Sequence, residues 1–397
     1  MNQYLKRLHA YPFEKFSGLL EGIVPLKTPC LDLSIGEPKH PVPEFIRQTM
    51  ANSLHGIGQY PTTKGYIELR QAIVDWLTNR YQLPPGLVEA ERHVLPVNGT
   101  REALFSITQA LVDHTKNDPL VLMPNPFYQI YEGATWMVGA HPVRVDCLAK
   151  NGFLPEYHTL STDTLNRVQL AYLCTPSNPT GTVLPLDYLK KWIHLAHEHN
   201  FILASDECYS EIWQDSPPPG LLQAAFELGL KDFSRCLVFN SLSKRSNMPG
   251  ARSGFVAGDP ELLAIYFQLR TYTGCATPPF IQRAACAAWK DETHVEENRA
   301  LYRQKINEAL EILTPHLPCP KPDAGFYLWL PVPSTGEIFA KELFRNQNVK
   351  VLPGAYLARP DNDSENPGTH FVRIALVAPL TENREAMQRI AEFVRHF

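Results

Sequence analysis

Short apolar runs alternate with amphipathic stretches along the chain as far as residue 257. The runs at 93–97, 119–123, 141–145, 169–174, 201–205, 236–240 and 254–257 are almost wholly apolar, which predicts buried strands. The stretches at 66–81 and 186–199 instead carry apolar residues at helical spacing. Buried strands separated by helices predict an α/β fold, in which a mostly parallel sheet is sandwiched between helices.

The pattern changes after residue 277. Two long helical stretches at 281–290 and 292–313 precede shorter segments at 325–330, 338–346, 349–352 and 371–377 and a last helix at 381–397. At the start of the chain, 4–20 predicts an arm or short helix and 31–35 a short strand. We therefore expect an N-terminal arm and part of a small domain at 1–45, a large domain at 46–285, and a smaller α+β domain at 286–397.

Polar residues stand directly after two of the predicted strands. A lysine amine can capture an aldehyde as a Schiff base, and hydroxyl and guanidinium groups bind phosphate through charge-assisted hydrogen bonds. Because ligands bind beyond the carboxyl ends of parallel strands, these residues predict a site for a phosphorylated aldehyde. The residues are Lys244, the flanking Ser241 and Ser243, Arg252 eight positions later, and Asp206.

Other candidates have weaker local support. The helix start at 99–101 (Gly99, Thr100, Arg101) offers free backbone N–H groups to a phosphate, and Tyr128 could stack on a cofactor ring. Arg373 lies in an apolar stretch and needs an anionic partner. Each also has an ordinary explanation: a capped helix, a buried aromatic residue, or an arginine paired with an aspartate. Likewise a lysine after a strand is commonly a surface residue, and an aspartate there is commonly a helix cap.

Composition narrows the function classes for this chain of 397 residues, of which 44% are hydrophobic and 20% charged. A net charge of −4 without a basic stripe argues against nucleic acid as a partner. The eight cysteines show neither CxxC nor Cys/His metal spacing, so we expect reduced thiols and no metal site. No run of 18 apolar residues and no signal-peptide core are present, so we expect a cytoplasmic protein without a membrane span.

The joint order of the motifs is more specific than any one of them. Asn178-Pro179-Thr180-Gly181, Asp206-x-x-Tyr209, Ser241-x-x-Lys244, Arg252 and Arg373 follow one another in an order that resembles the fold-type I, pyridoxal-phosphate-dependent aminotransferases of class I/II. The resemblance covers nearly the whole chain. The stretches 33–41, 98–105 and 241–254 look most like the succinyldiaminopimelate transaminases of bacterial lysine biosynthesis.

The resemblance implies roles around the cofactor, pyridoxal 5′-phosphate. Lys244 would carry it as a Schiff base and then move the substrate proton, while Asp206 would pair with the pyridinium nitrogen. Asn178 and Tyr209 would hydrogen-bond the phenolic oxygen. The other implied cofactor contacts are Gly99, Thr100, Arg101, Ser241, Ser243 and Arg252 at the phosphate, Tyr128 stacked on the ring, and Tyr60 reaching in from a second subunit of a homodimer.

The resemblance also implies the substrates. Arg373 would clamp the α-carboxylate, helped by the Gly36 backbone and Asn178. The amino group of N-succinyl-LL-2,6-diaminopimelate would be exchanged with 2-oxoglutarate and glutamate. These substrates carry a distant anion, which the Arg101 side chain could bind, although a solvent-facing Arg101 is the ordinary alternative.

Three rival functions stay open. An aspartate-preferring or broad-specificity aminotransferase is the nearest, and a C–S lyase using the same cofactor is the second, because a fold does not determine the reaction. A cofactor-binding regulatory module is the third, although no DNA-binding segment is evident in the sequence.

Overall fold

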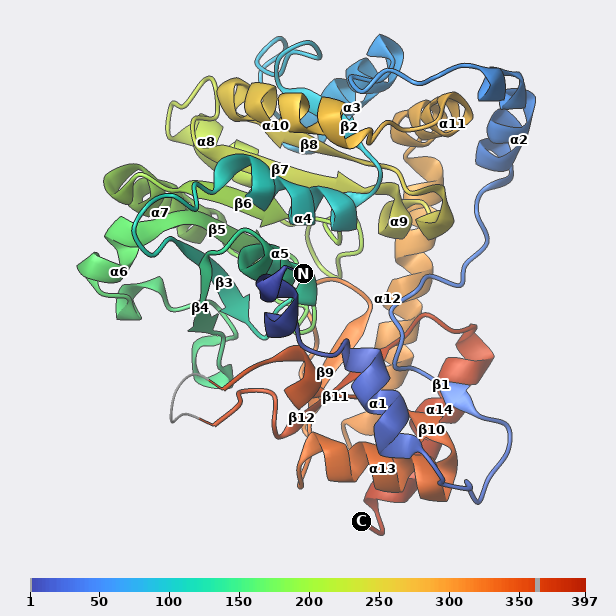
Figure 1. The fold of residues 1–397 in the computed structure, drawn as a ribbon. Coiled ribbons are helices and arrows are strands. Elements are labelled where there is room, and N and C mark those ends of the chain that lie inside the picture. Colours follow the sequence, from blue (N-terminus) through green and yellow to red (C-terminus); the bar gives the residue numbers. More distant parts are fainter. Residues whose placement is uncertain (1, 361–364) are drawn as a thin grey trace.

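The computed structural model describes residues 2–360 and 365–397 and shows two packed parts (Figure 1). The upper part contains a seven-stranded sheet in the order β2-β8-β7-β6-β5-β3-β4. Strand β8 is antiparallel to both β2 and β7, and every other neighbouring pair is parallel. The sheet is therefore mostly parallel, as predicted. Its strands are β2 (Val94–Val97), β3 (Leu120–Asn125), β4 (His141–Asp146), β5 (Val168–Cys174), β6 (Ile202–Asp206), β7 (Cys236–Ser241) and β8 (Gly254–Gly258).

Helices cover both faces of this sheet because successive strand residues point to opposite sides. In β6, for example, Leu203 packs into one core cluster and Ala204 into the other. One face is covered by α3 (Ile67–Arg80), α7 (Leu186–His199), α8 (Leu221–Glu227) and α11 (Pro279–Lys290). The other is covered by α4 (Thr100–Leu111), α5 (Gln129–Met137) and α10 (Pro260–Thr273). The remaining helices of this part are α2 (Glu44–Asn52), α6 (Thr162–Arg167) and the short α9 (Leu242–Arg245).

The lower part has its own core, made from both ends of the chain. Phe16, Leu20 and Leu31 are buried there among residues from beyond position 300. A three-stranded antiparallel sheet has the order β11-β12-β9, and β1 pairs with β10 in parallel. Its elements are α1 (Pro12–Leu20), β1 (Leu31–Asp32), β9 (Tyr327–Pro331), α13 (Gly336–Gln347), β10 (Val349–Lys350), β11 (Leu352–Pro353), β12 (Phe371–Ala375) and α14 (Leu380–Val394).

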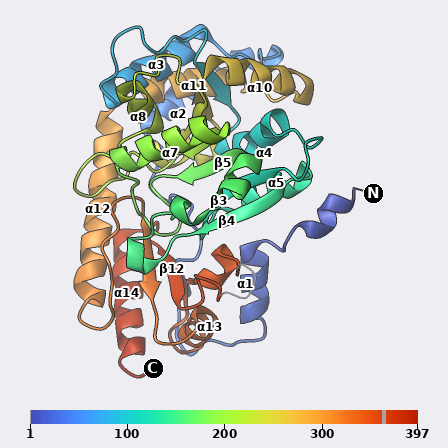
Figure 2. The same cartoon turned by 90° about the vertical axis from the view of Figure 1, so that its left-hand side faces the viewer.

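One long helix joins the two parts. Helix α12 (Thr293–Leu313) has 21 residues and is thus about 30 Å long. Figure 2 shows it running along the edge of both parts. Its residues Ile306, Ala309 and Leu313 lie in the lower core, while its first turns contact α9 of the upper part. The domain boundaries at residues 45 and 285 stay a prediction.

Three local expectations differ from the structure. The strand expected at 31–35 has only two residues, Leu31–Asp32. The single strand expected at 349–352 is two short strands, because Val349 and Lys350 pair with β1 while Leu352 and Pro353 pair with β12. Helices α5 and α10 were not predicted; in α10, Ile265 and Tyr272 are exposed, so no clean apolar stripe marks the helix.

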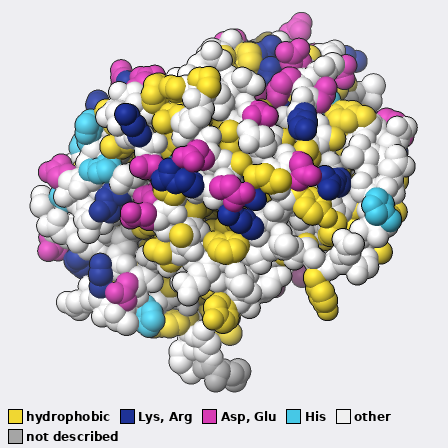
Figure 3. Space-filling model, turned by 90° about the horizontal axis from the view of Figure 1, so that it is seen from above, with side chains coloured by type: hydrophobic (Ala, Val, Ile, Leu, Met, Phe, Trp, Pro, Cys, Tyr) yellow, Lys and Arg dark blue, Asp and Glu magenta, His cyan; other side chains and the backbone are white. Residues whose placement is uncertain are grey.

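The surface view agrees with the modest net charge. On the face in Figure 3, lysine and arginine side chains are interspersed with aspartate and glutamate, without a continuous basic area on that face. Among the described residues, no helix is both long enough and apolar enough to cross a bilayer.

Candidate active site

A cleft of about 480 Å³ lies at the carboxyl ends of β5, β6 and β7. The N-terminal segment, the start of α4 and three residues of the lower part, Tyr327, Leu357 and Arg373, complete its walls. The cleft brings together residues from across the sequence, and twelve of the expected site residues line it. They are Gly36, Thr100, Arg101, Tyr128, Asn178, Asp206, Tyr209, Ser241, Ser243, Lys244, Arg252 and Arg373.

Lys244 lies on α9, directly after β7, and its amine points into the cleft. Its Nζ donates a hydrogen bond of 2.6 Å to the carbonyl oxygen of Gly36. Loss of water around the amine lowers the pKa of Lys244 to about 8, and the nearby Arg373 lowers it further while Cys208 opposes the shift. A lysine with this pKa is partly neutral, and hence nucleophilic, near neutral pH.

Asp206 ends β6 and is buried at the base of the cleft. Its Oδ2 accepts a hydrogen bond of 2.8 Å from the Tyr131 hydroxyl, and its Oδ1 accepts a 3.3 Å bond from the Cys208 backbone. Burial raises the pKa of Asp206, while these two bonds oppose the shift. No cation forms an ion pair with this carboxylate within residues 2–360 and 365–397, so a positively charged ring nitrogen would suit it.

Four segments converge on an anion-binding corner of the cleft: the end of β7, helix α9, the segment that carries Arg252, and the start of α4. The Ser241 hydroxyl accepts a hydrogen bond from the Ser243 backbone, capping α9, and donates to Ser243 Oγ at 2.9 Å. The Arg252 guanidinium donates to the Pro249 carbonyl at 2.8 Å and forms no ion pair among the described residues. It lies against Gly99, where a Cβ would be 2.3 Å from Arg252 Nη2. Free N–H groups at the start of α4 and an unpaired guanidinium suit a phosphate.

Arg373 from β12 is buried on the opposite side of the cleft. Its Nη1 donates to Asn178 Oδ1 at 2.9 Å and its Nη2 to the Ser34 carbonyl at 2.8 Å, while its guanidinium lies 4.4 Å from the Tyr327 ring centre. All of these partners are neutral, so no carboxylate of the described residues competes with an anionic ligand for this guanidinium. Asn178 is therefore brought to Arg373, as expected for the carboxylate clamp.

Two tyrosines occupy the same wall as Arg373. The hydroxyls of Tyr209 and Tyr327 are 3.0 Å apart. Burial, together with Tyr327, raises the pKa of Tyr209, so this phenol stays protonated and able to donate. Tyr327 also explains Gly36, because a Cβ at Gly36 would lie 1.8 Å from the Tyr327 hydroxyl oxygen. Only glycine lets the chain pass this close to the tyrosine.

Arg101 projects from the first turn of α4 and is held by two phenols. Its Nε donates to the Tyr128 hydroxyl at 2.7 Å and its Nη2 to the Tyr11 hydroxyl at 3.2 Å. It forms no ion pair with a carboxylate in the described parts of the chain. Tyr128 thus lines the cleft, and its hydroxyl is used to hold Arg101; its stacking on a cofactor ring stays a prediction.

Tyr60 stands apart from the cleft of this single chain. Its side chain is fully exposed and does not line the site. A role for Tyr60 therefore requires a second copy of the chain, as the family resemblance implies.

Sequence reasoning missed several residues of the site. Tyr131, Tyr327, Tyr11 and Ser34 all contact expected residues, yet none carries a local motif. The only available signal was that Tyr131 lies one helical turn after Tyr128 and so could face the same region.

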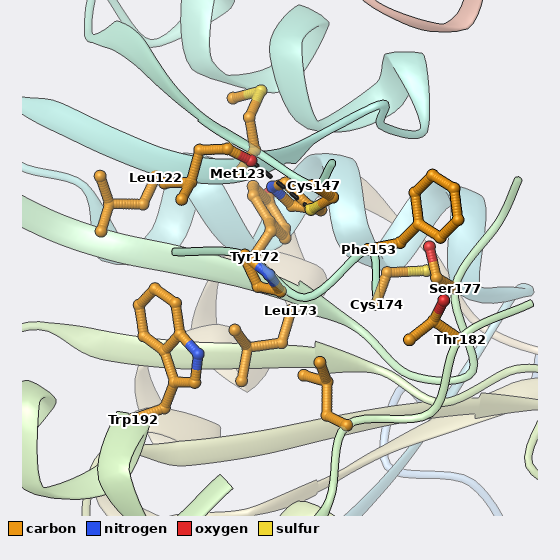
Figure 4. Close-up of a pocket in the computed structure, with 14 residues that line it drawn as sticks. Leu122, Met123, Cys147, Phe153, Tyr172, Leu173, Cys174, Ser177, Thr182 and Trp192 are labelled. Atoms are coloured by element: carbon orange, nitrogen blue, oxygen red, sulfur yellow. Dashed lines mark hydrogen bonds between the residues drawn. The ribbon is translucent and has the colours of Figure 1, made fainter. Parts of the chain in front are cut away.

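A second cavity is lined by residues of β3, β5 and α7 (Figure 4). Cys174 lines both spaces. Figure 4 shows Met123, Tyr172 and Trp192 around this cavity. Its free volume is about 10 Å³, room for about one water molecule, so it cannot accept a substrate.

The comparisons with known proteins agree with this geometry. An aminotransferase from Neisseria meningitidis is 45% identical, with a TM-score of 0.95 and all of both chains covered. An aminotransferase from Helicobacter pylori is 37% identical with a TM-score of 0.91, covering 98% of this chain and 100% of that one. The LL-diaminopimelate aminotransferase of Aquifex aeolicus is 30% identical over 395 residues, 97% of each chain.

A family model is also matched over most of the chain. The model for aminotransferases of class I and II covers residues 28–390. The amine of Lys244, the buried Asp206 carboxylate and the anion-binding corner at Arg252 fit the aldehyde, ring nitrogen and phosphate of pyridoxal phosphate, on which this family depends. This chain belongs to the class I and II aminotransferases, pyridoxal-phosphate enzymes of fold type I.

Proposed function

We propose that this aminotransferase exchanges an amino group between 2-oxoglutarate and a diamine dicarboxylate, with N-succinyl-LL-2,6-diaminopimelate as its preferred donor. The observation that carries the proposal is a pair of arginines, Arg373 and Arg101, that line one cleft without a carboxylate partner among the described residues. Arg373 binds the α-carboxylate at the reacting end. Arg101 binds an anion further along the substrate, which glutamate and the succinylated donor both carry.

Each residue around the cofactor site has a separate role in the proposed reaction. The cofactor supplies an electron sink for the charge that develops when the substrate loses its α-proton. Lys244 would hold the cofactor aldehyde, and its amine would take the proton from the substrate α-carbon. Asp206 keeps the ring nitrogen protonated, because a buried carboxylate favours a neighbouring positive charge. Tyr209 and Asn178 hydrogen-bond the phenolic oxygen.

The remaining residues bind and orient. Ser241, Ser243, Arg252 and the 99–101 backbone would hold the phosphate, and Tyr60 of a second subunit would complete this corner in a homodimer. The Arg373 fork fixes the α-carboxylate in one plane, which aims the Cα–H bond at the Lys244 amine.

A second substrate is favoured by a different observation. Several relatives at 28–30% identity are LL-diaminopimelate aminotransferases, whose name indicates a donor without the succinyl group. Such a donor has a free ammonium at its far end, and Glu37, a carboxylate lining the cleft, could pair with it. The aspartate-type aminotransferase remains the third candidate, and a C–S lyase is the last, because the family match is to aminotransferases.

The decisive experiment is a single-turnover screen of amino donors, followed by the change in the cofactor's visible spectrum. We expect kcat/KM for N-succinyl-LL-2,6-diaminopimelate to exceed that for free LL-diaminopimelate, aspartate and alanine by at least about tenfold. A reversed order between the first two donors would transfer the proposal to the unsuccinylated substrate. Pyruvate release from cystathionine without amino transfer would identify a lyase instead.

Arg101→Met tests the distal anion site. Loss of one charge-assisted contact is worth about 1.5–3 kcal/mol, so we expect KM for glutamate and for the succinylated donor to rise roughly 10- to 100-fold. Alanine has no distal carboxylate and should react equally well with both forms, which makes it the internal control. An unchanged KM for glutamate would remove Arg101 from the substrate site.

A further inference from the structure

A lysine is buried near the active site without an acidic partner. Lys305, on α12, is 3% exposed. Its Nζ lies 2.6 Å from His40 Nε2 and donates to the Val377 carbonyl at 3.4 Å. It forms no ion pair with any carboxylate of the described residues, and burial lowers its pKa to about 8. The lysine is thus mostly charged at neutral pH in a place where a charge is costly.

His40, which Lys305 contacts, is connected to Lys244 through hydrogen bonds of Asn298. His40 Nδ1 lies 2.8 Å from Asn298 Oδ1, and Asn298 Nδ2 donates to the carbonyl oxygen of Lys244 at 3.2 Å. Asn247 donates to the same Asn298 oxygen at 3.1 Å. The Asn298 amide is therefore held from both ends, with its oxygen towards His40 and its nitrogen towards Lys244.

These contacts close a ring around Lys244. The Lys244 side chain reaches the Gly36 carbonyl at 2.6 Å. Four residues later the same segment carries His40, which returns through Asn298 to the Lys244 backbone. Hydrogen bonds therefore connect Lys244 to segment 36–40 at two points, directly at Gly36 and through Asn298 at His40.

We propose that Lys305 and His40 are positioning residues for Lys244: the Lys305 ammonium fixes the tautomer of His40, and that tautomer orients Asn298, which holds the Lys244 backbone. An ammonium has donors only, so His40 Nε2 must accept and Nδ1 must carry the hydrogen. The Nδ1 hydrogen then requires an oxygen opposite it, which leaves the amide nitrogen for the Lys244 carbonyl. The opposite tautomer would turn the amide and set two oxygens against each other. The inference rests on the proposed role of Lys244.

The groups that face His40 make its proton uptake unfavourable. Burial lowers the pKa of His40, and the Lys305 charge lowers it further, while the bond to Asn298 opposes the shift. A protonated His40 would place two positive groups in direct contact. Removal of the Lys305 charge must therefore raise the pKa of His40. His40 contacts Lys305, Asn298 and the Tyr302 ring, all on α12. Asn247 and the Val377 carbonyl contact Asn298 and Lys305 in turn, and Lys39, which precedes His40 in the chain, also lowers the pKa of Lys305.

The test compares Lys305→Met with Lys305→Arg in the full-length holoenzyme. Long-range ¹H–¹⁵N spectra of the histidine rings, with the His40 signal assigned through its loss in His40→Asn, report both tautomer and pKa. We expect the Nδ1–H tautomer in the unmodified protein, its loss and a rise in the His40 pKa in Lys305→Met, and its retention in Lys305→Arg. We also expect kcat of both half-reactions to fall about tenfold in Lys305→Met, with KM changed less than about twofold.

Controls separate this inference from the proposed function. Lys190→Met removes a lysine of the surface helix α7 that pairs with Glu227 of α8, and it should leave the His40 spectrum and kcat unchanged. If no amino donor reacts with the unmodified enzyme, the proposed function fails while the tautomer can still be read. An Nε2–H tautomer in the unmodified protein would overturn the relay, and a tautomer change without loss of kcat would overturn the positioning role.

Discussion

At the scale of single residues, the surroundings of Lys244 determine the pKa of its amine. Its amine has one hydrogen bond, to a carbonyl, and no ion pair within the described residues. The pKa of about 8 follows from lost solvation and from the neighbouring arginines rather than from a hydrogen bond to a charged partner. Capture of an aldehyde requires the neutral amine, so this environment determines when the enzyme can load its cofactor.

The pH dependence of cofactor loading follows directly. A lysine whose pKa is lowered becomes neutral at lower pH than an ordinary lysine. We expect the rate at which apoenzyme gains visible absorbance on addition of pyridoxal phosphate to rise between about pH 7 and 9, with a midpoint near 8. Lys244→Ala should gain no such absorbance and should lose transamination, while Lys190→Ala should behave as the unmodified protein. Turnover by Lys244→Ala would remove this residue from the mechanism.

Which residues the sequence could reveal depends on how they are placed. Asp206 ends an apolar run and Lys244 follows one within four residues, so the strand pattern placed both near the carboxyl edge of the sheet, while their expected roles came from the family resemblance. Tyr131 and Tyr11 could not be located in this way, because their roles arise from contacts with Asp206 and Arg101 that exist only after folding. A motif records chain order, whereas these tyrosines act through tertiary proximity.

At the scale of elements, the start of α4 depends on Gly99. Its φ of +83° lies in the left-handed region, and a Cβ would approach the Arg252 guanidinium to 2.3 Å. Gly99→Ala should therefore cost about 1–2 kcal/mol in backbone strain and also displace Arg252 from the phosphate corner. We expect the dissociation constant of pyridoxal phosphate, measured by titration of apoenzyme, to rise at least about tenfold.

Gly86 provides the matched control. Its φ of +82° is almost the same, but a Cβ at this position would have no neighbouring atom within 4 Å. Gly86→Ala should lower the melting temperature through backbone strain alone, without weakening cofactor binding. Equal effects of the two substitutions on the dissociation constant would mean that Arg252 is not the group displaced.

The elements themselves were predictable where burial is one-sided or complete. Helix α7 lies at the predicted 186–199 because its apolar residues all face the sheet. The strands of the large sheet were recognised because both their faces are covered. The strands β1 and β10 lie within the predicted 31–35 and 349–352, but their two-residue lengths were not predicted, because such short strands are set by their partners across the chain rather than by their own composition.

At the scale of the whole molecule, the proposed role of Tyr60 requires a second subunit, because its side chain is fully exposed and does not line the cleft of its own chain. We expect a homodimer by light scattering, and a roughly tenfold weaker affinity for pyridoxal phosphate in Tyr60→Phe, as for loss of one hydrogen bond to a charged group. Mixed dimers of Lys244→Ala with Tyr60→Phe test whether the tyrosine acts across subunits. One of the two sites in such a hybrid then has both native residues, so its cofactor affinity should be native.

The mixed dimers would also show whether Tyr60 acts within its own chain. If Tyr60 acted within its own chain, every hybrid site would lack either Lys244 or Tyr60, and no site with native affinity would appear. A monomer in solution with full activity would likewise exclude the shared site.

The pairing of Leu31 in β1 with Val349 in β10 has a consequence for biosynthesis. A ribosome that adds about 5–20 residues per second must work for roughly 15–60 s between these two positions. During that time Phe16, Leu20 and Leu31 have no finished core to enter, although the large sheet can already assemble. These apolar side chains therefore stay exposed on the nascent chain for most of its synthesis. Such exposed apolar segments are the ones that chaperones acting on nascent chains bind.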